Sequence, residues 1–405
     1  MRNANSYSQS ITLVICLISL VLSYSLLATF GLFFVAMVDE FHWTATAGSL
    51  GFAVSWLSRS IFSPLSGFSY SKFGIKKMTT VGAIILALGL TLSSTMSNQW
   101  QYVVYFGIIV SAGATTLGMS HSLLIPRWFN KKRGFAMGTV STAYGLGPLI
   151  FFPVINASIE EFGWRSTLNF YAGVLLIFSI LCALLIQDGP NKIQQKTNLS
   201  SPASPTWSLM QAVKSTRFWA LVTMYIGGYL GYQMLVAHQV AHAEAVGFSR
   251  ESIILTLSIM GGFTLVGAII GGWASDKLGR ETVFFSSSVI GSLGILSFAL
   301  LSIFPSNYTL LAIFCIMGGL GFGMRLPLVL TIAADVFQGP LFPKLIGFLG
   351  IATAIGGFLG PLLAGFVFDL TGSYLPALGV STVAMLTSGC IVWIVAPRKG
   401  LLQII

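Results

Sequence analysis

The chain consists of long apolar runs that are separated by short polar connections. Crossing the hydrocarbon core of a bilayer takes about 20 mostly apolar residues in an α-helix. Twelve runs reach this length, at residues 11–38, 47–70, 78–97, 101–125, 134–158, 166–187, 218–245, 252–275, 283–304, 308–333, 345–368 and 375–396. They lack the strict alternation of a transmembrane β-strand, so the pattern predicts an all-α membrane protein with twelve transmembrane helices.

Composition supports this interpretation and excludes several function classes. Of the 405 residues, 55% are hydrophobic and only 8% are charged, whereas a soluble domain carries about 25% charged residues. A nucleotide-binding P-loop pattern and a nucleophile–base arrangement are both missing from the sequence, and the four cysteines fall inside predicted spans without metal-ligand spacing. We therefore expect neither an enzyme nor a bound cofactor.

The basic residues predict the orientation. Seventeen of the 21 lysines and arginines lie on the same side of the predicted helices as both chain ends, while Arg165 and Arg250 lie on the other side. The remaining two, Arg59 and Arg325, fall inside predicted spans. The positive-inside rule then places both termini in the cytoplasm. The bases face anionic membrane lipid rather than nucleic acid, and the short loops suggest a bacterial inner membrane.

One connection is long and polar. Residues 188–214 contain three prolines and several serines, a composition typical of a flexible linker. We expect a first six-helix half at residues 1–187, a cytoplasmic linker at residues 188–216 and a second six-helix half at residues 217–405.

A loop motif occurs twice at matching places in the two predicted halves. Its stronger copy contains Gly272, Asp276, Lys277, Gly279 and Arg280, and its weaker copy keeps Gly67, Lys72 and Gly74. Glycine permits a sharp turn and a close helix approach, and the bases hold the loop on the cytoplasmic side. Residues 43–77 align with 248–282, and residues 127–148 align with 340–361, which indicates an internal duplication.

This G-x-x-x-D-K/R-x-G-R/K pattern resembles the repeated loop of major facilitator superfamily transporters. Other segments, including Arg127-Trp128-Phe129, Gly147-Pro148 and Gly163-Trp164-Arg165, are similar to the bacterial monocarboxylate porters and oxalate–formate exchangers. The resemblance implies two pseudo-symmetric six-helix halves that rock about a midplane site. It further implies a monomeric secondary transporter of a small organic anion.

The chain departs from that group at one position. The group often carries an arginine in its eighth helix that binds the substrate carboxylate, but Ala268 stands at this position and the predicted helix has no base. The anion charge would then come from Arg59 or Arg325. A mid-membrane arginine costs about 2.5 kcal/mol or more unless it faces a cavity or a partner. The alternative for Arg59 is a structural role, paired with Glu244, with backbone carbonyls at a broken helix, or snorkelling toward the membrane surface. Arg325 could snorkel as well.

Further polar residues inside the predicted spans are candidates for solute binding or proton coupling. Tyr229 and Gln233 share a helix face, and together with Tyr24 and Tyr144 they could line a cavity or bond between helices. His121, His238 and Glu244 are the candidates for proton coupling, with exchange without protons as the alternative. His238 and His242 have zinc-compatible spacing but no third ligand in the sequence, so no metal is expected.

These observations predict a secondary active transporter that moves a small organic anion, a monocarboxylate above all, by alternating access. Its expected partners are the solute, protons and membrane lipid. Two alternatives are a transporter of a larger solute, such as a siderophore or a drug, and a non-transporting sensor that kept the fold.

Overall fold

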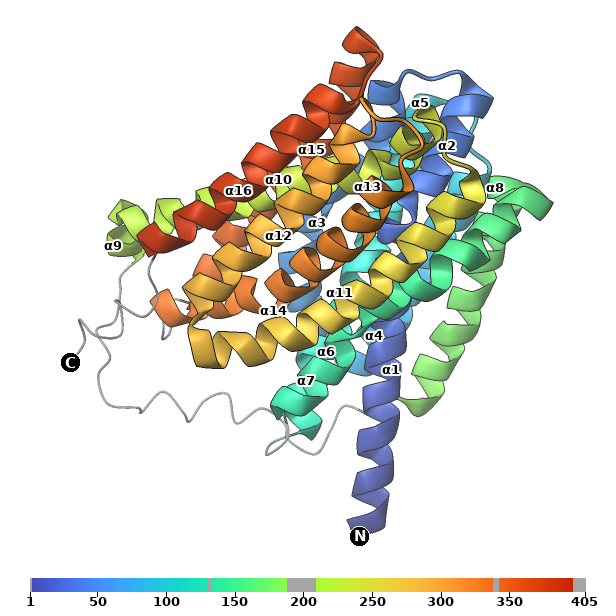
Figure 1. The fold of residues 1–405 in the computed structure, drawn as a ribbon. Coiled ribbons are helices and arrows are strands. Elements are labelled where there is room, and N and C mark those ends of the chain that lie inside the picture. The colour runs from blue at the N-terminus through green and yellow to red at the C-terminus, as the bar shows by residue number, and fades with distance from the viewer. Residues whose placement is uncertain (1, 130–132, 188–208, 338–341, 396–405) are drawn as a thin grey trace. The chain divides into compact units, whose positions relative to one another are not determined.

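The structure is a computed structural model that describes residues 2–129, 133–187, 209–337 and 342–395, and these ranges contain helices but no strand (Figure 1). Ten helical segments in them are long and apolar enough to cross a membrane. The prediction of an all-α, multi-pass membrane protein is thereby confirmed.

The chain divides into two compact units. The first comprises Met1–Ala36 and Leu50–Lys196, and the second comprises Met37–Ser49 and Thr197–Ile405. The main boundary lies in the predicted linker. A short segment of the first half, Met37–Ser49, belongs with the second unit, which the sequence did not indicate.

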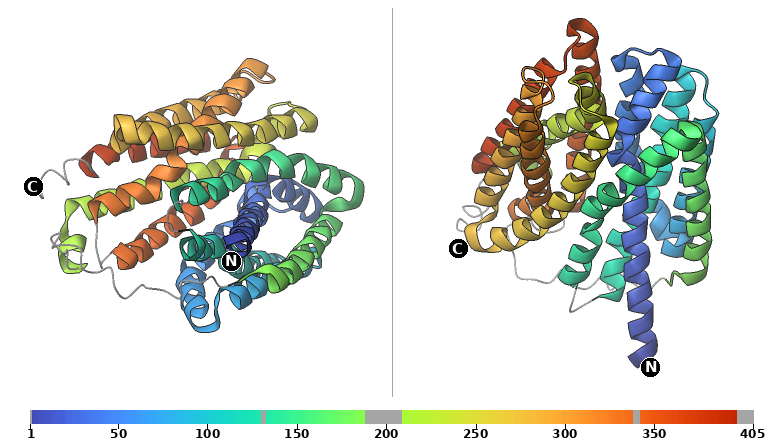
Figure 2. Two further views of the ribbon diagram at one scale, coloured as in Figure 1. Left: turned by 90° about the horizontal axis from the view of Figure 1, so that it is seen from below. Right: turned by 45° about the vertical axis from the view of Figure 1, so that its right-hand side comes forward.

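The first half of the chain contains α1 (Arg2–Ala28), α2 (Phe30–Phe41), α3 (Ala45–Phe73), α4 (Ile75–Ser94), α5 (Gln99–Tyr102), η1 (Val103–Val110), α6 (Ser111–Trp128), α7 (Arg133–Ser141) and α8 (Ala143–Leu185). α1 and α4 both pack against α6 and α8. Within α8 the backbone leaves the helical conformation at Gly163, and the chain reverses direction near the middle of this element (Figure 2).

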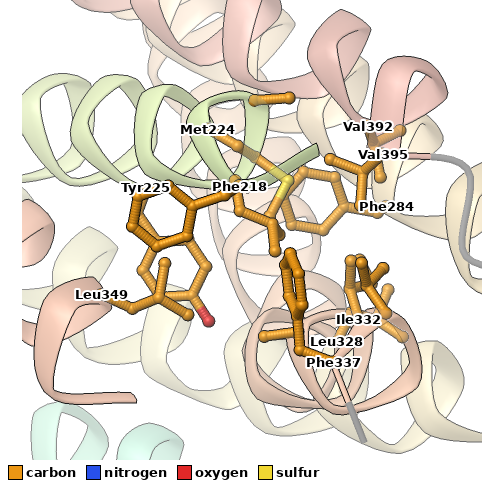
Figure 3. Close-up of a cluster of buried hydrophobic side chains, with 14 of the residues drawn as sticks. Phe218, Met224, Tyr225, Phe284, Leu328, Ile332, Phe337, Leu349, Val392 and Val395 are labelled. Atoms are coloured by element: carbon orange, nitrogen blue, oxygen red, sulfur yellow. The ribbon is translucent and has the colours of Figure 1, made fainter. Parts of the chain in front are cut away.

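The second half contains α9 (Leu209–Lys214), α10 (Thr216–Ala245), α11 (Arg250–Leu278), α12 (Arg280–Leu300), α13 (Tyr308–Ile313), η2 (Phe314–Gly318), α14 (Gly319–Val336), α15 (Phe342–Thr371) and α16 (Leu375–Val395). α10 packs against α15 and α16, α11 packs against α14, and α12 packs against α14 and α16. Figure 3 shows one end of their shared core, where Phe218, Phe284, Leu328 and Phe337 meet.

The internal duplication is visible in the backbone. Gly74, before α4, has φ 87° and ψ 158°, and Gly279, before α12, has φ 97° and ψ 148°. Only glycine adopts this region readily, so the repeated loop motif needs a glycine at this place. The π-helical turns η1 and η2 also recur at matching positions, each after a short helix that begins next to Asn98 or Asn307.

Small residues set the spacing between neighbouring helices. A Cβ atom added at Gly113 of α6 would collide with the backbone nitrogen of Leu86 in α4. In the second unit, a Cβ atom at Gly294 of α12 would lie 2.5 Å from the backbone nitrogen of Gly318 in η2. Association of helices in lipid depends on such close contacts, because the apolar solvent provides no hydrophobic driving force.

We expect Gly113→Ala to lower the melting temperature of the purified protein in detergent. The added methyl group meets backbone that cannot move aside, and overpacking of this kind costs about 1–3 kcal/mol. Gly173→Ala in α8 is the matched control, because a Cβ atom there meets nothing within 4 Å. Alanine is also the better helix former, so the control should melt at or above the parent temperature. Equal melting temperatures for the two variants would contradict the assigned α4–α6 packing.

Candidate functional site

Arg325 of α14 is the central charge of the second unit. Its side chain is only 6% exposed. Its Nη1 donates to Ser288 Oγ at 2.8 Å, its Nη2 donates to Ser388 Oγ at 2.5 Å, and its Cζ lies 4.2 Å from the centroid of the Phe284 ring. Among the described residues, no carboxylate lies within ion-pair distance of this guanidinium.

The side chains around Arg325 are oriented to accept hydrogen bonds from its guanidinium. Ser288 Oγ donates to the Phe284 carbonyl at 2.9 Å and Ser388 Oγ donates to the Met224 carbonyl at 2.5 Å, so both hydroxyl oxygens are left to accept. Gly228 of α10 leaves the space, since a Cβ atom there would collide with Nη2. The guanidinium therefore joins α10, α12, α14 and α16 through neutral groups only.

The contacts of α10 define which of its faces is covered. Gly227 and Gly231 approach the backbone of α16, and Ile226 and Leu230 approach α15. Tyr225 and Tyr232 face α14: the Tyr225 hydroxyl donates to the Val329 carbonyl at 2.8 Å, and Tyr232 stacks on Phe322 with 3.7 Å between ring centroids.

The helical positions of Tyr229 and Gln233 fall between the α14-facing and α15-facing residues. Tyr229 is close enough to Arg325 to interact with it electrostatically. Gln233 is 5% exposed, and its amide forms no hydrogen bond with any residue in the described ranges. The structure thus places Tyr229 near Arg325, and Gln233 lies about one turn further along α10.

In the first unit, the structure brings Tyr24 and Tyr144 together. The two half-buried rings meet edge to face, with 4.8 Å between centroids. Next to Tyr24, Ser25 bonds to the Tyr171 hydroxyl at 2.8 Å, which ties α1 to α8. Two predicted solute-binding tyrosines, Tyr24 of α1 and Tyr144 of α8, therefore form one aromatic pair.

Arg59 lies on the face of α3 that points toward α6. It shares this face with Ser63, whose hydroxyl lies 3.8 Å from Met119 Sδ, and with Ser66, which bonds to Thr116 Oγ1 at 2.8 Å. The Arg59 guanidinium lies 5.4 Å from the centroid of the Trp56 ring, and the side chain is partly exposed. The ion pair of Glu244 is formed with Arg250, at 2.9 Å.

His238 is the proton candidate with the most complete set of partners. It is 2% exposed. Its Nε2 lies 3.0 Å from both the Pro361 carbonyl and Ser49 Oγ, and its Nδ1 lies 3.2 Å from the Tyr374 hydroxyl. Burial raises the pKa of Tyr374, so this hydroxyl stays protonated and can donate to Nδ1. A neutral imidazole with its hydrogen on Nε2 satisfies all three partners.

The other two proton candidates have fewer contacts. His121 is partly buried, and its Nε2 lies 3.2 Å from the hydroxyl of the neighbouring Ser122. Glu244 is held by Arg250, with side chains that are 28% and 26% exposed. Within the described ranges, no group of three or more His, Cys, Asp or Glu side chains could hold a metal ion.

The residues of the repeated loop motif differ in the contacts that they form. Arg280 forms an ion pair of 2.7 Å with Asp335 at the end of α14, whereas the motif acid, Asp276, is exposed. Lys277 lies over the Trp273 ring at 4.3 Å, and in the weaker copy Lys72 lies over the Phe73 ring at 5.3 Å. Gly74 and Gly279 supply the turns described above, and Gly67 and Gly272 lie one to two turns before the ends of α3 and α11.

Sequence reasoning missed the residues that hold the predicted ones. Ser288 and Ser388 lie in apolar runs, where nothing in the sequence marks them as partners of Arg325. The sequence likewise does not indicate the ion pair between Asp335 and Arg280. Asp369, near the end of α15, also has partners that are distant in sequence. The available signal was a polar residue inside or at the edge of an apolar run, which needs a partner in lipid.

Comparison with known proteins gives a consistent result. The Major Facilitator Superfamily profile matches residues 15–240 and 229–403. Among similar curated proteins, monocarboxylate transporter 13 of Rattus norvegicus is 26% identical over 93% of this chain and 86% of its own length. Monocarboxylate transporter 11 of Homo sapiens is 25% identical over 93% of this chain and 80% of its own length. The uncharacterized MFS-type transporter YcxA of Bacillus subtilis is 23% identical over 88% of this chain and 87% of its own length.

We expect His238→Phe to lower the melting temperature in detergent clearly more than His121→Phe does. The first change leaves the Pro361 carbonyl and two hydroxyls without their buried partner, and each such loss costs about 1–3 kcal/mol. The second change removes one contact with an adjacent serine. A similar small shift for both variants would show that the contacts of His238 contribute little to stability.

Proposed function

Since the chain belongs to the Major Facilitator Superfamily, and is therefore a membrane transporter and not an enzyme, we propose that it carries a small organic anion, with monocarboxylates as the first substrate class. The observation that carries this proposal is Arg325. A positive charge whose direct contacts are hydroxyls, a thioether and an aromatic ring leaves an electrostatic potential in the apolar interior that attracts anions.

The proposed topology has twelve spans with both termini in the cytoplasm. Ten segments qualify by length and apolarity. The reversal at Gly163 divides one of them in two, and α3, with 29 residues, is long enough to be another. The base distribution favours cytoplasmic termini, and the short loops favour a bacterial inner membrane.

A solute with one carboxylate suits a site with one central guanidinium. Arginine binds carboxylates with two parallel hydrogen bonds and strong geometric preference. The monocarboxylate transporters named above are relatives over most of the chain, which supports the same class. Tyr229 and Gln233 would supply neutral hydrogen bonds beside Arg325. Arg59 and the Tyr24–Tyr144 pair are the proposed contributions of the first unit.

Proton coupling is proposed through His238. A proton added at Nδ1 would find the Tyr374 oxygen as its acceptor while the Nε2 hydrogen keeps its present partners. The titratable groups around this imidazole are Tyr374, His242, which packs against the same tyrosine ring, and Asp369, which acts through its charge.

A larger solute is the second candidate. α11 carries its two bases, Arg250 and Lys277, at its ends, and Ala268 stands at the place where a carboxylate-binding arginine is expected. The stacked pair of Tyr232 and Phe322 offers a flat apolar surface on α10 and α14 instead.

Uptake of labelled lactate, pyruvate, formate, oxalate, succinate and citrate into proteoliposomes tests the substrate class. We expect a monocarboxylate to accumulate and Arg325→Met to reduce its initial rate by a factor of ten or more, about the effect of one lost charge-assisted contact. Methionine keeps much of the apolar volume, so the variant should still fold. Arg325→Lys should retain part of the rate, because it keeps the charge.

Arg250→Gln is the matched control, since it removes an arginine that is bound to a partly exposed carboxylate. Its rate should stay within a factor of about two of the parent, as expected for a surface ion pair. Full uptake by a folded Arg325→Met variant would remove the main support for the proposal. Uptake of siderophore-sized solutes alone would favour the second candidate.

An imposed pH gradient tests the coupling. We expect an acidic donor side to drive accumulation by the parent protein, and His238→Gln to lose this gradient dependence while it retains exchange of the same solute. Glutamine can still form hydrogen bonds but does not take up a proton. Unchanged gradient-driven accumulation by His238→Gln would exclude His238 as the coupling group.

A further inference from the structure

The beginning of α3 is held by a carboxylate that is far away in sequence. Asp369, in the last turn of α15, accepts hydrogen bonds from the backbone nitrogens of Ala45 at 2.8 Å and Thr46 at 3.0 Å, and from the Thr46 hydroxyl at 2.6 Å. All of these residues belong to the second unit.

These bonds complete the N-terminal cap of α3. The first N–H groups of a helix have no partner within the helix, and they favour negative charge. Thr44, the residue before α3, serves only the third of them, with 3.2 Å from the Ala47 nitrogen to its Oγ1. The first two N–H groups take Asp369 as their protein partner, so this helix end has its full cap only while α15 lies against it.

Two further contacts continue this interface between α15 and the start of α3, which we call the seam, along one face of α15. Four residues before Asp369, a Cβ atom at Gly365 would lie 2.7 Å from the Ala45 carbonyl carbon, so the two backbones touch. Four residues earlier, the Pro361 carbonyl and Ser49 Oγ both lie 3.0 Å from Nε2 of His238. Residues spaced by four share a helix face, so the seam is one continuous line of contact.

The seam is suited to opening. Asp369 is exposed, so water can replace its bonds when they break, whereas Ser49 is completely buried in the closed seam. The contacts described above are hydrogen bonds and one close backbone approach, both of which can break and form again. α3 continues beyond Ser49 into the first unit, from Leu50 onward.

We propose that Asp369, Gly365 and His238 form a latch on the N-terminal end of α3, from Ala45 to Ser49, and that release of this latch is a step of the transport cycle. Alternating access changes the contacts between the two halves of such a transporter, and α3 belongs to the first half by sequence. The proposal rests on the family membership and on these contacts, and it holds for any transported solute.

The test measures exposure of Ser49 in the full-length purified protein. Ser49→Cys is introduced into a background in which the four native cysteines are replaced by alanine, and the rate of reaction with a soluble maleimide is followed in detergent. We expect Asp369→Asn to raise this rate on the order of tenfold, the factor that corresponds to loss of a helix cap. Gly365→Ala should raise it as well, because the methyl group forces the backbones apart while the carboxylate is kept.

Glu251→Gln is the matched control. It removes an exposed carboxylate from the first turn of another helix of the second unit, α11, and should leave the labelling rate unchanged. An unchanged rate in a folded Asp369→Asn variant would overturn the proposal, as would an equal rise with Glu251→Gln. If Asp369→Asn fails to fold, Gly365→Ala tests the proposal alone, and an unchanged labelling rate in that variant would overturn it. No solute is needed, so the outcome does not depend on the proposed substrate class.

Discussion

The apolar surroundings of a membrane protein impose the constraint on which this structure depends: each polar group within the spans needs a partner from the protein. The helices satisfy the backbone, and several charged and phenolic side chains follow the same rule. The carboxylates of Glu244 and Asp335 lie near helix ends and are paired with arginines, while Asp369 is paired with a helix N-terminus. Tyr225 and Tyr171 donate to backbone carbonyls of other helices.

Arg325 satisfies this constraint in a different way, and the difference links stability to function. Two serines, a thioether and a phenylalanine ring satisfy its hydrogen-bonding and packing requirements without neutralising its charge. A carboxylate at the same place would have made a closed ion pair with little attraction for a solute. The arrangement therefore anchors four helices of the second unit and preserves a positive potential near Tyr229.

Close helix packing and reversible contact both follow from small residues. Gly113, Gly228 and Gly294 fix distances inside each unit, where a methyl group would displace backbone or the central arginine. Gly365 allows an equally short approach at the first turn of α3, but there the remaining contacts are hydrogen bonds that water can replace. Glycine at a helix contact thus gives rigid packing inside each unit and a separable contact at the start of α3, because the neighbouring contacts differ.

The sequence by itself determined the helical fold, the duplicated loop motif and the polar positions inside the spans, because apolar run length and glycine spacing are local properties of the chain. It also singled out Arg325, Tyr229, Gln233 and His238. Only the tertiary structure decided which groups they meet: Ser288 and Ser388 for Arg325, Tyr374 and Ser49 for His238, and Asp335 for Arg280. It also assigned Met37–Ser49 to the second unit. These partners lie tens to hundreds of residues apart, and no local pattern encodes such contacts, because packing between helices selects them.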